Sequence, residues 1–135
     1  MKRLKIAIVT PHRHYYGGVE VFNAMLEGIL SDHEITYVTL DETFPQTFLE
    51  KLSCKFLTKA ALTKKRFMQE HEEFDVVICN GEYGFGVHHP RSINIFHGCA
   101  SGYRAAIYPF ISWKDRFLLS CQAYIQKLSA KKKYV

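Results

Sequence analysis

LKIAIV, residues 4–9, is the stretch that decides the fold. It is rich in apolar and β-branched residues, lacks the regular polar alternation of a half-exposed strand, and is ended by Pro11, which predicts a short buried strand. FDVVIC, residues 74–79, has the same character and is followed by Asn80 and Gly81. Apolar strands of this kind are typical of parallel sheets whose two faces are covered by helices. We therefore expect both stretches in the centre of such a sheet.

The rest of the chain alternates between helical and strand-like patterns. Apolar residues at helical spacing predict helices, and runs rich in Ile, Thr, Tyr and Val predict further strands. The expected helices are 19–30, 44–52, 64–71 and 113–130, and the expected strands are 34–40, 54–57 and 92–96. Such alternation builds βαβ units with right-handed crossovers. The sequence therefore predicts an α/β fold with a doubly wound, mainly parallel sheet and helices on both faces, in one domain over residues 1–135.

Two of the expected helices carry an apolar face. In the helix over 19–30 the face holds Phe22, Met25, Leu26, Ile29 and Leu30. In the helix over 113–130 it holds Trp113, Phe117, Leu118, Cys121, Tyr124, Ile125 and Leu128. Both sets follow the period of 3.6 residues, which predicts amphipathic helices. After the second helix, residues 131–135 enter what reads as a further strand, so we expect the natural domain to continue.

The composition limits the class of protein. With 47% hydrophobic and 23% charged residues the chain is neither disordered nor collagen-like. No apolar run approaches the roughly 18 residues of a membrane-spanning helix. The apolar stretch near the N-terminus is too short for a signal peptide, so we expect none. Eighteen basic residues against 13 acidic ones give a net charge of +5, which favours anionic partners such as nucleotides, phosphates or an anionic membrane. The four widely spaced cysteines indicate reduced thiols in a cytoplasmic protein.

The unusual polar residues follow the expected strands. In an open α/β sheet, ligands bind at the carboxyl ends of the strands, so these loops hold the candidate binding residues. They are Arg13, Tyr16, Gly17, Gly18 and Glu20 after the first strand, Asn80, Glu82 and Tyr83 after the strand over 74–79, and His97, Gly98 and Arg104 after the strand over 92–96.

Gly17 and Gly18 open a helix, where backbone N–H groups attract an anion, which predicts proximity to a phosphate or a sugar. The alternative is a glycine demanded by the turn itself. For Glu20 the alternative is a charge that complements the helix dipole. His97 ends an apolar strand and precedes a glycine, so its ring either hydrogen-bonds a substrate hydroxyl or is a satisfied structural imidazole.

The sequence lacks the motifs that are typical of several other functions. The histidines and cysteines have no zinc-ligand spacing and no HExxH occurs, so we expect no metal. There is no GxSxG elbow for a hydrolase, no GxGxxG or P-loop, and no RNP or helix-turn-helix pattern. We therefore expect no nucleic-acid partner. Lysine runs of this kind usually mark a solvated face.

The order of these motifs resembles the N-terminal half of GT-B glycosyltransferases of group 1 (family 4). The stretch KIAIVTPHRHYYGGVEVFNAMLEGIL, residues 5–30, is similar to their opening strand, Gly-Gly loop and helix. FDVVICNGEYG (74–84) is similar to a middle strand with its polar loop, and INIFHG (93–98) to a later strand that ends in His-Gly. AYIQKLSAKKKYV (123–135) is similar to the helix that precedes a further strand. The resemblance covers nearly the whole chain.

This resemblance implies a function and a partner domain. Such enzymes are retaining and metal-independent, and move a sugar from a nucleotide-sugar donor to a saccharide or lipid-linked acceptor, as in cell-envelope polysaccharide biosynthesis. The N-terminal domain binds the acceptor and a C-terminal domain binds the donor. The resemblance places Gly17 and Gly18 near the donor diphosphate and His97 at the transferred sugar, as the catalytic contact.

The chain departs from the family in lacking the C-terminal donor domain with its spaced pair of glutamates. We therefore expect the isolated chain to be inactive. The alternatives are a free-standing Rossmann-like protein that binds a nucleotide or anion, and an accessory subunit of a transferase. The basic residues of the last helix and the Lys131–Lys133 run predict peripheral association of the enzyme with the inner face of a membrane, with a solvated helix face as the alternative.

Overall fold

A computed structural model shows a parallel sheet of four strands in the order β2-β1-β3-β4. It describes residues 2–13, 17–40, 55–70 and 73–131. The strands are β1 (Lys5–Val9), β2 (Glu34–Val38), β3 (Val76–Asn80) and β4 (Ser92–Ile95). Each neighbouring pair is parallel, with Ile8 opposite Tyr37 on one side and Ile78 on the other. The predicted α/β fold is confirmed, and the two central strands are those expected from residues 4–9 and 74–79.

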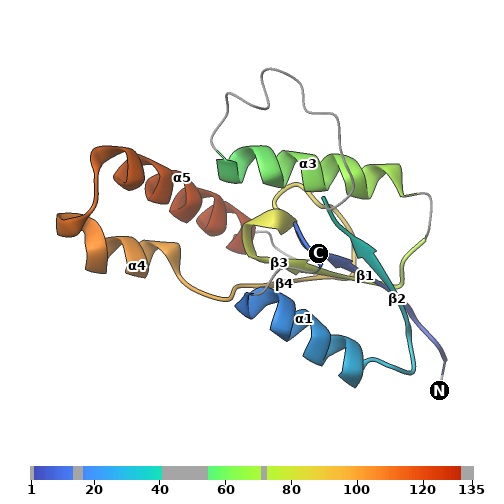
Figure 1. Cartoon of the computed structure of the whole chain (residues 1–135). Coiled ribbons are helices and arrows are strands. Elements are labelled where there is room, and N and C mark those ends of the chain that lie inside the picture. Colours follow the sequence, from blue (N-terminus) through green and yellow to red (C-terminus); the bar gives the residue numbers. More distant parts are fainter. Residues whose placement is uncertain (1, 14–16, 41–54, 71–72, 132–135) are drawn as a thin grey trace.

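Helices cover the two faces of this sheet (Figure 1). Helix α1 (Gly18–Ile29) connects β1 to β2 and lies on one face, whereas α3 (Lys55–Gln69) precedes β3 and lies on the other. From β1 the chain adds β2 at one edge of the sheet. It then returns to the other side of β1, where it forms β3 and, beyond it, β4 at the opposite edge. The strand order therefore reverses between β1 and β3, which is where doubly wound sheets bind ligands.

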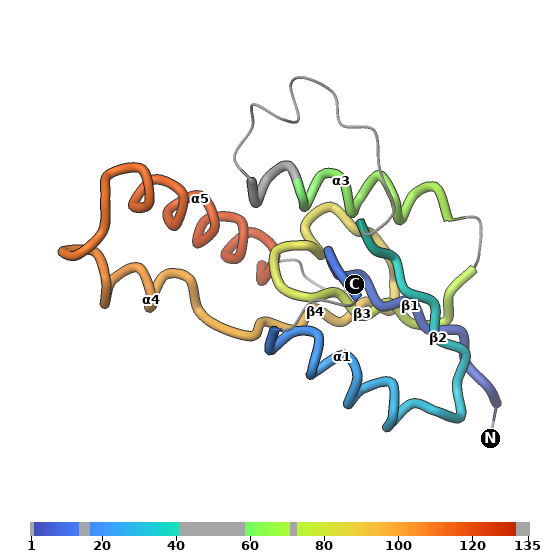
Figure 2. Tube along the Cα trace, viewed as in Figure 1, coloured from blue at the N-terminus to red at the C-terminus, as the bar shows by residue number. Residues whose placement is uncertain are grey.

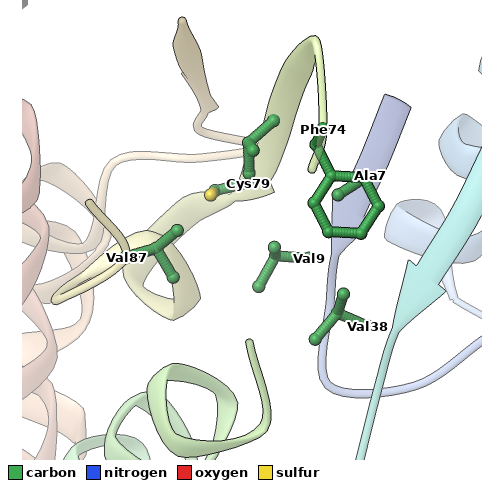
Figure 3. Packing of buried hydrophobic residues seen from close by; sticks show 7 residues of the cluster. Ala7, Val9, Val38, Phe74, Cys79 and Val87 are labelled. Atoms are coloured by element: carbon green, nitrogen blue, oxygen red, sulfur yellow. The ribbon is translucent and has the colours of Figure 1, made fainter. Parts of the chain in front are cut away.

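The core lies between the sheet and α3. Side chains alternate across a strand, and Ala7, Val9, Val77 and Cys79 share one face, on which Phe67 of α3 packs. Val38, Phe74 and Val87 complete this cluster, and Figure 3 shows its labelled side chains gathered in one space. The other face carries Ile6, Ile8 and Ile78, which are also buried. Both central strands are thus buried on two sides.

A pair of helices extends away from the sheet. After β4 the chain forms α4 (Ala100–Ile107), the 3-10 turn η2 (Tyr108–Phe110) and α5 (Trp113–Ala130). Helix α4 packs against α5, and α5 packs against α3 and against the 3-10 turn η1 (Gly81–Gly84) that follows β3. In Figures 1 and 2 the turn between α4 and α5 is the part farthest from the strands.

Two expectations in the middle of the chain are corrected. Residues 55–57 of the expected strand over 54–57 are helical, and the expected helix over 64–71 begins nine residues earlier, because one helix covers Lys55–Gln69. Three apolar residues were too few to define a strand. In the helix, Ala60, Thr63 and Phe67 stand at i, i+3 and i+7; the first two are buried, and Phe67 packs on the core cluster. Residues 44–52 and Cys54 lie outside the described residues.

The helices after β4 and β1 also differ from expectation. Helix α4 was not predicted, because ASGYRAAI has glycine in its first turn and no apolar period. In α1, Met25 and Ile29 are 63% and 76% exposed, although both belong to the expected apolar face. The face that meets the sheet instead includes the buried Asn23.

Candidate functional site

A cavity of about 410 Å³ lies at the carboxyl ends of β3 and β4. Its wall combines residues from both sides of the point where the strand order reverses, since Val19 opens α1 and Asn80 ends β3. The other described lining residues are Gly81, Glu82, Tyr83, His97, Gly98, Cys99, Ala100, Tyr103, Gln122 and Gln126. Of the expected candidates, Asn80, Glu82, Tyr83, His97 and Gly98 are thus brought together. A larger cavity, of about 610 Å³, lies near Phe74 and His89, at the amino ends of the strands.

His97 is held by a chain of amides. Its Nε2 lies 2.8 Å from Asn80 Oδ1, and Asn80 Nδ2 donates to Asn23 Oδ1 at 2.9 Å. Because the bond to Asn23 directs the amide nitrogen of Asn80 away from the imidazole, its oxygen faces the ring. His97 Nε2 is therefore the donor in this bond, and in the tautomer that has its single ring proton there, Nδ1 is an acceptor. Phe22 packs edge-on against the imidazole, with ring centroids 5.0 Å apart.

Asn23 is the member of this chain that sequence reasoning missed. It is 2% exposed on the sheet-facing side of α1, and its Nδ2 has no partner among the described residues. A buried amide with an unpaired donor is costly. The sequence does show a polar residue in an apolar stripe, because Asn23 stands at i+4 from Val19 in α1. Its hydrogen-bond partner, Asn80, is 57 residues away and could not be predicted from that pattern.

Glu82 connects the cavity wall to the last helix. Its side chain is buried, Oε1 accepts from Gln122 Nε2 at 2.8 Å, and Oε2 accepts from Gln126 Nε2 at 3.2 Å. Gln126 Oε1 in turn accepts from the backbone N–H of Ala100 at 2.9 Å, at the start of α4. One carboxylate thus fixes α5, and through it α4, relative to β3. Each carboxylate oxygen keeps further acceptor capacity for a ligand.

Tyr83 shows the acidic character of this region. Burial, followed by the charges of Glu82 and Glu20, raises the pKa of Tyr83 to about 12. The phenol is therefore a neutral donor and acceptor at ordinary pH. Among the described lining residues none is lysine or arginine, and Glu82 carries the charge.

The glycines at the start of α1 have different surroundings. A Cβ at Gly17 would lie 2.6 Å from Glu20 Oε2, so the carboxylate of Glu20 lies over the first turn of α1. Gly17 is the N-cap of α1. Its backbone is extended, and it has no side chain that could cap the helix. A carboxylate at this position complements the helix dipole, which was the alternative reading of Glu20, and it places negative charge where a phosphate was expected. A Cβ at Gly18 would meet open space.

The two arginine candidates lie outside the cavity lining. Arg13 pairs with Glu27 at 3.4 Å and stacks over the ring of Tyr37 at 4.4 Å. Burial, the charge of Glu27 and a hydrogen bond to it raise the pKa of Tyr37 to about 12. Arg104 donates to Ser120 Oγ at 2.7 Å and thereby joins α4 to α5. Tyr16 lies outside the described residues.

The expectations on metal ligands, thiols and membrane-spanning helices can be compared with the part of the chain that the structure describes. No group of three or more His, Cys, Asp and Glu there could hold a metal ion. Cys79, Cys99 and Cys121 carry thiols rather than disulfides. Within the same ranges, no helix is both long enough and apolar enough to cross a bilayer.

Comparison with known proteins gives no match, whether with family models, with curated proteins or with solved structures.

Proposed function

We propose that this chain is the acceptor-binding half of a retaining glycosyltransferase, which moves a sugar from a nucleotide-sugar donor to a saccharide or lipid-linked acceptor. The observation that carries the proposal is the cavity at the carboxyl ends of β3 and β4, whose described lining includes amide, carboxylate and imidazole side chains but no lysine or arginine. The resemblance of the motifs to GT-B glycosyltransferases supports the same reading.

The chemistry of the wall suits a neutral, hydroxyl-rich ligand. Asn80, Gln122 and Gln126 supply amides, Glu82 supplies a carboxylate, and His97 supplies an imidazole. Amides, carboxylates and imidazoles exchange hydrogen bonds with sugar hydroxyls as both donors and acceptors. A nucleotide or free anion would instead favour arginine and lysine. This distinction favours an acceptor saccharide over the anion-binding alternative.

His97 would act on the substrate through its second nitrogen. Because Nε2–H is bonded to Asn80, Nδ1 is available as an acceptor for a sugar hydroxyl, and the ring orients that sugar for attack. One positioned hydrogen bond in a site from which water is excluded contributes roughly 10²-fold in rate. The nucleotide-sugar diphosphate would be held by a second domain, as the resemblance implies.

The test uses the gene product at its natural length. It is incubated with radiolabelled UDP-, GDP- and ADP-linked sugars, together with a lipid and polysaccharide extract of the source cells as acceptor. We expect label to move from one donor, and the product to keep the anomeric configuration of that donor. If none of the donors transfers label, the proposal is refuted.

A variant pair then tests the site itself. His97→Ala is expected to lower turnover about 10²-fold without lowering the melting temperature, because the side chain is exposed. The matched control is His88→Ala, an exposed histidine before β4, which should keep full turnover. Wild-type turnover in His97→Ala would remove His97 from the site, and UDP or phosphate bound by the cavity of the chain itself would contradict the acceptor role.

A further inference from the structure

The turn between α4 and α5 exposes large apolar side chains at the point farthest from the sheet (Figure 1). Phe110 is 86% exposed and Trp113 is 74% exposed. Neither lines the candidate site, and both belong to this protruding turn. Exposed apolar groups that are contiguous rather than scattered mark an interaction surface.

Specific hydrogen bonds hold this turn in place. Arg116 Nε donates to the carbonyl of Ile111 at 3.2 Å, and its guanidinium lies 4.4 Å from the ring centroid of Tyr108. Ser112 caps α5, since its Oγ accepts from the N–H of Asp115 at 3.2 Å. The two aromatic side chains are thus presented by an ordered turn, which reduces the entropy lost when they bind.

The exposed surface continues along α5. Trp113, Phe117 and Tyr124 stand at i, i+4 and i+11, on one face of the helix, and the last two are 61% and 63% exposed. These residues were expected to belong to the apolar face, yet the residues of α5 that are buried are Ile125 and Ser129. Tyr103 of α4 adds a further ring, 60% exposed.

Basic side chains outnumber acidic ones in this segment. Residues 100–131 contain five basic side chains and one acidic side chain, Asp115. Asp115 accepts a hydrogen bond from Ser112 Oγ at 2.6 Å. Lys114 Nζ lies 5.8 Å from the Trp113 ring, and Lys127 and Lys131 continue the aromatic face at i+14 and i+18 from Trp113. The surface therefore combines an apolar tip with a basic flank.

We propose that the α4–α5 turn docks on an anionic lipid bilayer, with Phe110 and Trp113 inserted at the level of the headgroups. Aromatic rings with basic neighbours suit the bilayer interface, where the rings enter the apolar boundary and the cations meet anionic headgroups. A protruding turn can enter a deformable bilayer, whereas single-stranded nucleic acid is usually tracked by a basic groove. This inference does not rest on the proposed transfer reaction, because it concerns a different surface and is tested without turnover.

The single tryptophan of the chain reports directly on the proposed contact. The full chain is titrated with vesicles of phosphatidylcholine mixed with phosphatidylglycerol, and with vesicles of phosphatidylcholine alone. We expect a blue shift of Trp113 fluorescence, and quenching by brominated lipid, with the anionic vesicles. Binding should weaken as the salt concentration rises, because salt screens the basic flank.

Two variant pairs separate the apolar and charged contributions. Phe110→Ala keeps the reporter and should weaken partitioning about tenfold. Ile29→Ala, which changes another highly exposed apolar residue, on α1, should leave partitioning unchanged. Lys114→Glu with Lys127→Glu should also weaken it about tenfold or more. The matched charge control is Lys2→Glu with Arg3→Glu, at the other end of the molecule.

Three results would overturn the proposal. The first is a Trp113 spectrum unchanged by anionic vesicles. The second is self-association without lipid that Phe110→Ala abolishes, which would make the turn an interface between copies of this chain. The third is a fluorescence change with a single-stranded oligonucleotide and none with vesicles. Loss of glycosyl transfer in the natural-length protein would not bear on this surface.

Discussion

At the scale of single residues, the site depends on two asparagines that keep one histidine in a defined state. Asn80 ends a buried strand, and its amide has two functions. The nitrogen donates to Asn23, and the oxygen faces His97. An aspartate could only accept the bond from His97, and an aliphatic residue of similar size could perform neither function. The hydrogen bond to Asn80 therefore orients the imidazole of His97, while His97 remains exposed to solvent.

A double-mutant cycle on the two asparagines tests this arrangement. Asn80→Ala should lower the free energy of unfolding by about 1–3 kcal/mol, because it leaves the buried oxygen of Asn23 unpaired. Asn23→Ala should cost less, since it also removes an amide nitrogen that has no described partner. The two effects should be less than additive by about 1 kcal/mol in urea unfolding, because the double variant removes both partners.

The same cycle has a readout specific to His97. Nitrogen-15 NMR of the imidazole should show a single Nε2–H tautomer in the wild type and a mixture in Asn80→Ala. Strictly additive free energies, or an unchanged tautomer in Asn80→Ala, would show that the amide chain does not orient the ring.

At the scale of elements, the turn η1 is the piece that shapes the cavity. It turns the chain sharply at Gly81, whose φ is +56°, and leads to Gly86, whose φ is +90°. In between, a Cβ at Gly84 would lie 2.6 Å from the Cβ of Cys79 and within 3 Å of the Asn94 side chain. Close packing of η1 onto β3 and β4 thus depends on a position without a side chain, and this packing sets where Glu82 meets α5.

The element-scale prediction follows from that close approach. Gly84→Ala should destabilise the protein by about 1–3 kcal/mol, because an added methyl group must displace the strand residues beneath it. Gly28→Ala is the control and should raise the stability of the protein. Its Cβ would meet nothing within 4 Å, and alanine is favoured over glycine in a helix by up to about 1 kcal/mol. Thermal unfolding of the two variants compares them, and a neutral Gly84→Ala would mean that η1 is not tightly packed.

At the scale of the whole molecule, burial is concentrated in the two central strands. Ile8 in β1 is fully buried, whereas Ile93 in the edge strand β4 is 52% exposed. The sheet therefore has a well-packed centre between α1 and α3 and a partly uncovered edge next to the α4–α5 pair (Figure 1).

A matched isoleucine pair measures this difference. Ile8→Ala should lower the free energy of unfolding by about 2–5 kcal/mol, through lost burial and the cavity left behind. Ile93→Ala, the same change in another strand, should cost well under half as much, because half of its side chain already meets solvent. Equal losses in chemical denaturation would indicate that β4 is covered in solution and would contradict the exposed edge.

The sequence by itself determined the class of fold and the edge of the sheet where polar residues collect. Residues 4–9 and 74–79 predict central parallel strands, because side chains buried on both faces leave an apolar run that can be read locally. Asn80, Glu82, Tyr83 and His97 could be named as candidates, because parallel strands bring their carboxyl ends to one edge. Both inferences need only the alternation of elements along the chain.

Only the tertiary structure decided which surfaces are covered and which polar groups are partners. Periodicity placed Trp113, Phe117 and Tyr124 on an apolar face of α5, but a period records spacing and not whether another element packs there, and these rings are exposed. Likewise, the pairing of Asn23 with Asn80 joins residues 57 apart in the sequence. Contacts of that kind depend on how α1 crosses the sheet, and no local pattern in the chain encodes that crossing.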